Sequence, residues 1–201
     1  MGAIQRFKAW WQRIVVDDLE DWDGEPSAEE ARNEAKALKK LRAELHIWIV
    51  TTFDFLGADV AEKLFRRVRR ETGGGDDQSI EPSSALRDGL LGDFFKGGRA
   101  PFIFIFEARY TEDAEKILGK VCGSYGISDR FQHDETTQGA IPSLVLRKFK
   151  DWLVERSFDL IIFDTGSDEY CGFLIPLDAL ENVISGLRAM GVKATNIPED
   201  C

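Results

Sequence analysis

Residues 158–176 read FDLIIFDTGSDEYCGFLIP, and this stretch decides how the C-terminal half of the chain folds. Two apolar runs, 160–163 and 170–175, are rich in the aliphatic and aromatic side chains that favour strands. The polar residues between them, 164–169, include the Asp, Gly and Ser that dominate turns. The pattern predicts a β-hairpin with an acidic turn.

Each turn residue has an expected task. The side chains of Asp164 and Ser167 can bond nearby backbone N–H groups, and Gly166 can supply a positive φ. Asp168 and Glu169 are expected to keep the turn solvated. As a binding site, these carboxylates suit Lys or Arg on a partner protein.

The run Ile161–Ser167 also resembles the active-site strand and turn of pepsin-like aspartic proteases. Those enzymes need two Asp-Thr-Gly turns, because two carboxylates share one proton and activate one water. This chain has a single such turn. The part that follows Asp164 is too short for both a flap and a second glycine turn, and Ile184-Ser185-Gly186 lies in an expected helix. We therefore interpret the match as coincidental.

The remaining elements follow from hydrophobic periodicity and from capping signals. Ser27 and Glu30 form a capping box that begins the first long helix. The expected helices cover 27–50, 58–70, 84–95, 111–123, 142–155 and 177–190, and two further strands cover 101–106 and 192–196.

This order predicts an α+β protein with a helical region at 1–96 and a sheet domain at 97–201, packed together as one unit. From residue 101 the elements follow a ferredoxin-like βαββαβ pattern with one inserted helix. Two right-handed crossovers would place both main helices on one face of an antiparallel sheet. The unbroken apolar run 101–106 is expected to form a central strand.

The chain is acidic, with 26 Lys and Arg against 36 Asp and Glu and a net charge of −10. This balance argues against nucleic-acid binding and favours a basic protein partner. The basic run Arg66–Arg70 ends an expected helix, where the helix dipole favours cations. We interpret it as a solvated helix end.

The N-terminus offers an alternative contact surface. Phe7, Trp10 and Trp11 lie on one side of a short basic amphipathic pattern. Such a helix can bind a membrane surface or a partner, or it can dock on its own domain. We expect no transmembrane segment and no signal peptide.

The three cysteines are odd in number and fit no metal-ligand spacing. Cys122 and Cys171 are expected to be small core residues, and Cys201 to be exposed. The absence of a disulfide framework predicts a reducing cytoplasm. We assign no cofactor and no metal.

The segment 164–174 has the pattern Asp-x-Gly-x-Asp-x-Tyr-x-x-Phe-Leu. In this pattern the C-terminal portion resembles an uncharacterised bacterial domain family, over roughly the last hundred residues. The resemblance implies a bacterial, intracellular protein. It carries no established activity, so it transfers no functional residue.

The leading hypothesis is a non-enzymatic protein-binding module with an acidic surface, for example a toxin-neutralising immunity protein. One alternative is an enzyme that uses a carboxylate pair or a divalent cation at Asp164 and Asp168. Another is a peripheral membrane protein that uses the Trp10-Trp11 helix. With only His46 and His133 available, a His-dependent triad has few candidates.

Overall fold

The fold is known from a computed structural model, which describes residues 27–72, 81–92, 101–107, 114–132 and 142–197. It divides into two compact units, Met1–Leu41 and Arg42–Cys201. The predicted N-terminal contact residues Phe7, Trp10 and Trp11 lie outside the described residues.

The described part of the first unit is the beginning of helix α2 (Ala28–Phe53). The predicted capping box is confirmed. Ser27 N donates to Glu30 Oε2 at 2.8 Å, and Glu30 N donates to Ser27 Oγ at 3.3 Å. These bonds from Ser27 hold the pKa of the Glu30 carboxyl below its usual value.

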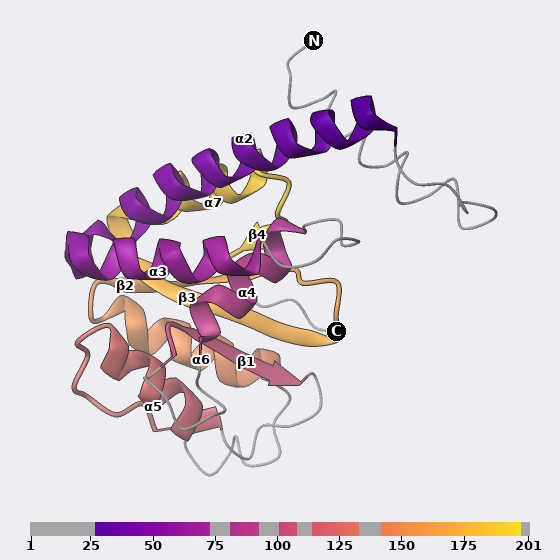
Figure 1. The fold of residues 1–201 in the computed structure, drawn as a ribbon. Helices are drawn as coiled ribbons and strands as arrows, with labels where there is room; N and C mark the ends of the chain where they lie inside the picture. The colour runs from indigo at the N-terminus through magenta and orange to yellow at the C-terminus, as the bar shows by residue number, and fades with distance from the viewer. Residues whose placement is uncertain (1–26, 73–80, 93–100, 108–113, 133–141, 198–201) are drawn as a thin grey trace. The chain divides into compact units, whose positions relative to one another are not determined.

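The second unit begins within α2 and contains the sheet (Figure 1). Its other helices are α3 (Ala58–Glu71), α4 (Pro82–Leu91), α5 (Ala114–Ser124), α6 (Pro142–Val154) and α7 (Leu180–Ala189), with 3-10 turns η1 (Asp54–Leu56) and η4 (Leu177–Ala179). Its strands are β1 (Ile103–Glu107), β2 (Phe158–Phe163), β3 (Glu169–Pro176) and β4 (Ala194–Thr195).

The four described strands form one antiparallel sheet in the order β1-β3-β2-β4. The predicted hairpin is confirmed, because β2 pairs with β3 in a register that sets Ile161 opposite Phe173 and Phe163 opposite Cys171. On its other side, β3 pairs with β1, with Ile103 opposite Phe173.

The predicted central position of the first strand is wrong. Among the described strands, β1 lies at one edge of the sheet and pairs only with β3, while β4 pairs with β2. The ferredoxin-like topology is therefore not confirmed. The apolar run 103–106 has another cause, because α4 and α5 both contact β1. The continuous hydrophobicity of β1 therefore reflects burial of both its faces by helices, and not a central position in the sheet.

The expectation that both main helices share one face is also wrong. The crossovers β1 to β2 and β3 to β4 each move the chain past one strand in the same direction. The strands from which they start, β1 and β3, are antiparallel to each other. Two right-handed connections in the same direction therefore place their helices on opposite faces of the sheet. α5 and α6 cover one face, and α7 lies on the other (Figure 1).

The helices that precede the sheet complete the core on the α7 face. The Phe173 ring of β3 lies 6.0 Å from Trp48 and 5.6 Å from Phe53, both in the second unit's part of α2. α7 can pack closely against Trp48 because residue 186 is glycine. A Cβ at this position would lie 2.5 Å from Trp48 Cδ1. The sheet therefore shares its core with helices from the N-terminal half.

Within the described residues, no helix is both long enough and apolar enough to cross a bilayer.

Candidate functional site

In the turn between β2 and β3, the predicted bond of the Asp164 side chain to a backbone N–H is confirmed. Asp164 Oδ1 accepts a hydrogen bond from Gly166 N at 2.8 Å, and Gly166 has φ +74°. A positive φ is strained for most side chains, which explains the glycine. The predicted side-chain bond of Ser167 is not seen among the described residues, and its backbone carbonyl instead accepts from Glu169 N at 2.8 Å. These bonds fix the shape of the turn.

Glu169 is not the solvated turn residue that we expected. Its side chain is 12% exposed, and Arg87 Nε of α4 lies 2.7 Å from its Oε1. Arg87 Nη2 also donates to Glu169 Oε2 at 3.3 Å, and Thr165 Oγ1 donates to Oε1 at 3.2 Å. The expectation was wrong because the partner, Arg87, comes from a distant part of the chain.

The other three predicted binding residues are exposed: Asp164, Ser167 and Asp168. Lys193 Nζ lies 3.4 Å from Asp164 Oδ2, in a pair with side chains 85% and 49% exposed. An ion pair so open to water contributes roughly 0–1 kcal/mol. The turn therefore presents two carboxylates that a partner can reach.

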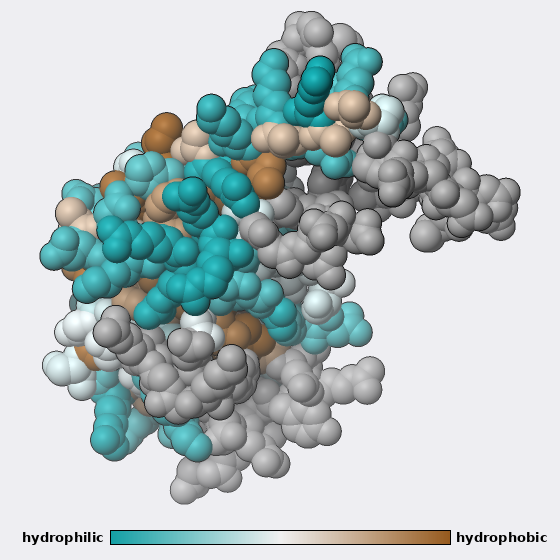
Figure 2. Space-filling model, viewed as in Figure 1, coloured by the Kyte–Doolittle hydropathy of each residue, from teal (hydrophilic) through white to brown (hydrophobic). Residues whose placement is uncertain are grey.

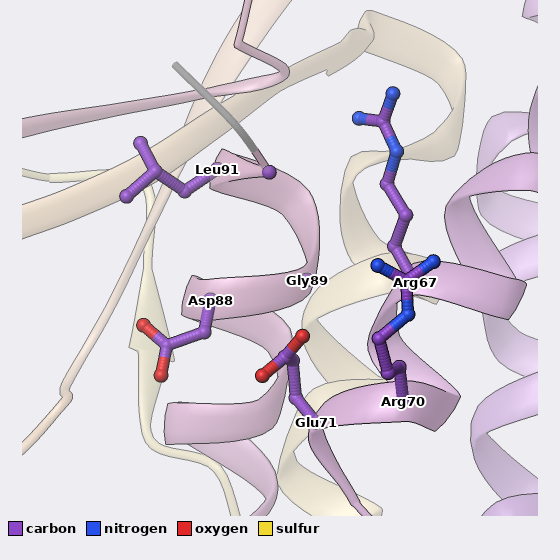
Figure 3. Close-up of a pocket in the computed structure, with 7 residues that line it drawn as sticks. Arg67, Arg70, Glu71, Asp88, Gly89 and Leu91 are labelled. Carbon is purple, nitrogen blue, oxygen red and sulfur yellow. The ribbon is translucent and has the colours of Figure 1, made fainter. Parts of the chain in front are cut away.

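A cleft of about 410 Å³ lies between α3 and α4 (Figure 3). The two helices approach closely at Gly89, where a Cβ would meet Val68 Cα at 2.5 Å. Toward one end of the cleft are the carboxylates of Glu71 and Asp88, and toward the other are guanidinium groups of α3. Its lining residues are Arg67, Arg70, Glu71, Asp88, Gly89, Leu91 and Gly92.

The cleft is connected to the acidic turn through side chains of α4. Arg87 Nη1 donates to Asp88 Oδ1 at 3.2 Å, and the same guanidinium pairs with Glu169. The basic run of α3 was recognisable from the sequence, but the cleft and the role of Arg87 were not. A hairpin pattern and a helix pattern contain no signal that α4 docks beside the turn.

A metal centre finds no support in the described part of the chain, which holds no group of three or more His, Cys, Asp or Glu side chains placed to bind an ion. Cys122 and Cys171 are free and buried, as predicted. Burial raises the pKa of the Cys122 thiol to about 11 and raises that of Cys171 as well. Neither thiol is poised as a nucleophile, because the thiolate is the reactive form.

Taken together, these features define an α+β protein with an exposed acidic turn in its hairpin and a charged cleft between α3 and α4. Residues 101–197 match the model of the family described as "Domain of unknown function (DUF6630)". The C-terminal half of the chain is thus a domain of this family, as the predicted resemblance to an uncharacterised family indicated. No curated protein and no solved structure matches the chain.

Proposed function

We propose that this protein is a non-enzymatic protein-binding module, and that its acidic turn contacts a basic segment of its partner. The observation that supports this most is the fixed, exposed turn, in which Asp164 Oδ1 accepts from Gly166 N at 2.8 Å. A contact loop that is already ordered loses less conformational entropy on binding. Binding through Asp164 and Asp168 would therefore cost little conformational entropy.

The four residues named from the sequence take different parts in this proposal. Glu169 anchors the turn through Arg87 and is not offered to the partner. Asp164, Ser167 and Asp168 are exposed and form the contact surface. An Arg of the partner can bind a carboxylate in a bidentate manner, which is stronger than the open Lys193–Asp164 pair that it would displace.

The net charge of −10 supports a basic partner. Summed surface charge steers an oppositely charged protein during encounter and raises its association rate at low salt. A toxin-neutralising immunity protein of the bacterial cytoplasm is one concrete version of this function. It would bind a basic toxin surface without catalysing any reaction.

The test compares two variants that remove the same charge. D164N/D168N changes the turn, and D178N/E181Q changes two exposed carboxylates near the start of α7. Each tagged protein captures partners from a bacterial lysate, and the recovered proteins are quantified by mass spectrometry. We expect at least one basic protein to be lost with the turn variant and retained with the α7 variant.

The affinity for that partner is then measured by titration of the purified pair. We expect D164N/D168N to weaken it about tenfold, or ~1.4 kcal/mol, with a smaller effect at high salt. An identical set of captured proteins for the wild type and the turn variant would remove the proposal.

A further inference from the structure

The C-terminal half of α3 carries four arginines, Arg66, Arg67, Arg69 and Arg70, which we call the arginine face. Three of them are exposed and Arg67 is half-buried. Figure 2 shows the strongest hydrophilic colour gathered over α3. Among the described residues, none of the four forms an ion pair or a side-chain hydrogen bond. The arginine face is thus a concentrated positive surface on a protein of net charge −10.

Helix stability alone does not account for this cluster. Arginines three or four positions apart, such as Arg66 and Arg70, repel each other by roughly 0.2–0.5 kcal/mol. The helix dipole favours cations only within the last turn, which contains Arg69 and Arg70. Arg67 packs against Gly92 at the end of α4. Its Nη1 lies 3.0 Å from the position that a Cβ on Gly92 would occupy. In the part of the chain that the structure describes, Arg66 makes no ion pair or side-chain hydrogen bond that would give it such a structural role.

The adjacent cleft indicates the kind of ligand. Its lining combines the guanidinium groups of Arg67 and Arg70 with the carboxylates of Glu71 and Asp88 (Figure 3). Guanidinium groups bind carboxylates or phosphates in a bidentate manner. Asp88 Oδ1 already accepts from Arg87 Nη1, but both carboxylates are exposed and can accept further hydrogen bonds from the same ligand. An acidic peptide offers both, because its side chains carry carboxylates and its backbone carries N–H groups.

We propose that the arginine face binds an acidic segment of a protein partner, with one carboxylate of that segment in the cleft between Arg67 and Arg70. The acidic turn lies beside this surface, but the proposal does not use Asp164, Ser167 or Asp168 and does not depend on the function proposed for them. A nucleic acid fits less well, because its phosphate groups have no hydrogen-bond donors for Glu71 and Asp88.

The experiment measures binding of a fluorescein-labelled hexaglutamate peptide to the full chain by fluorescence anisotropy. The variant R66E/R70E reverses two charges of the arginine face. The variant K36E/K39E makes the same change in charge at exposed lysines of α2. We expect R66E/R70E to weaken binding by about tenfold or more and K36E/K39E to change it less than about twofold. Thermal unfolding of each variant checks that it is folded.

A second variant separates specific recognition from charge alone. R70K keeps the charge but loses the planar fork of the guanidinium, so we expect it to weaken peptide binding about threefold. D164N/D168N should leave peptide binding at wild-type strength or slightly stronger, which distinguishes this site from the acidic turn. Absence of peptide binding, equal loss in K36E/K39E, or tighter binding of tripolyphosphate or duplex DNA than of the peptide would overturn the proposal.

Discussion

Arg87 of α4 and Glu169 of β3 are 82 residues apart in the chain, yet Arg87 Nε lies 2.7 Å from Glu169 Oε1. Thr165 Oγ1 donates to the same oxygen at 3.2 Å. The pair therefore joins a helix of the N-terminal half to the turn of the C-terminal hairpin. It holds the acidic turn beside the α3–α4 cleft.

This pair can be tested by a double-mutant cycle with Arg87→Ala and Glu169→Gln. Each single change leaves a poorly solvated partner, so we expect a loss of about 2 kcal/mol in the free energy of unfolding. The coupling energy should be about 1 kcal/mol. Urea denaturation measures both. Asp129→Asn, which removes the 63%-exposed partner of Arg156, serves as the control. A loss for Glu169→Gln no larger than for Asp129→Asn would contradict the prediction.

The same substitution at two glycines should have opposite effects. At Gly172 of β3, a Cβ would collide with the Ile161 carbonyl oxygen and the Phe104 ring. We expect Gly172→Ala to destabilise the protein by about 3 kcal/mol, because a neighbouring strand and a buried ring must move. At Gly119 of α5 nothing lies within 4 Å of the added Cβ. There alanine should stabilise by up to about 1 kcal/mol.

Thermal unfolding with calorimetry distinguishes the two outcomes. A lower melting temperature for Gly172→Ala and a higher one for Gly119→Ala are expected. Equal melting temperatures for the two variants would show that Phe104 does not pack over Gly172 as described.

Asp159 is a buried carboxylate that ties β2 to the segment after β4. Its Oδ1 accepts from Leu160 N at 2.7 Å, its Oδ2 accepts from Asn196 Nδ2 at 3.1 Å, and Lys150 Nζ lies 3.8 Å away. We expect Asp159→Ala to lower the free energy of unfolding by about 3 kcal/mol, because it leaves these buried donors without an acceptor. Asp178→Ala at an exposed position should change stability by less than about 0.5 kcal/mol. Chemical denaturation compares them, and similar losses would refute the role of Asp159.

Cys122 should make stability depend on alkaline pH. Burial raises its pKa from 9.0 to about 11, so the folded state binds the proton more tightly than the unfolded state. The stabilisation is fully present below pH 9 and is lost as the pH rises toward 11. Burial also raises the pKa of Cys171 and Tyr125, which act in the same direction.

The measurement is the free energy of unfolding between pH 8 and pH 11 for the wild type and Cys122→Ala. We expect a shallower decline with pH in the variant. At pH 8, iodoacetamide should label Cys122 and Cys171 only after denaturation. Rapid labelling of either thiol in the folded protein would be inconsistent with its burial.

Local features of this protein were predictable because they depend on neighbours in the chain. The Ser27–Glu30 capping box forms as expected, and so does the hairpin with its positive φ at Gly166. The helices and strands lie close to the predicted ranges wherever the structure describes them. Periodicity and turn chemistry act over a few residues, and the amino-acid sequence states them directly.

The candidate site was predictable only in part. Asp164, Ser167 and Asp168 are exposed on the turn, as their residue types suggested. Glu169 looked identical to Asp168 in the sequence, yet it is paired with Arg87. Which of two neighbouring carboxylates is solvated depends on which distant element packs against the strand. Neighbouring residues in the sequence do not indicate that element.

By itself, the sequence determined the elements, the acidic hairpin turn, the buried cysteines and the overall charge. Only the tertiary structure decided that β4 pairs with β2, that α7 lies opposite α5 and α6, and that α4 meets the turn. The physical reason is that strand order and helix docking follow from competition among distant apolar surfaces. A periodic pattern specifies which face of an element is buried, but not which partner buries it.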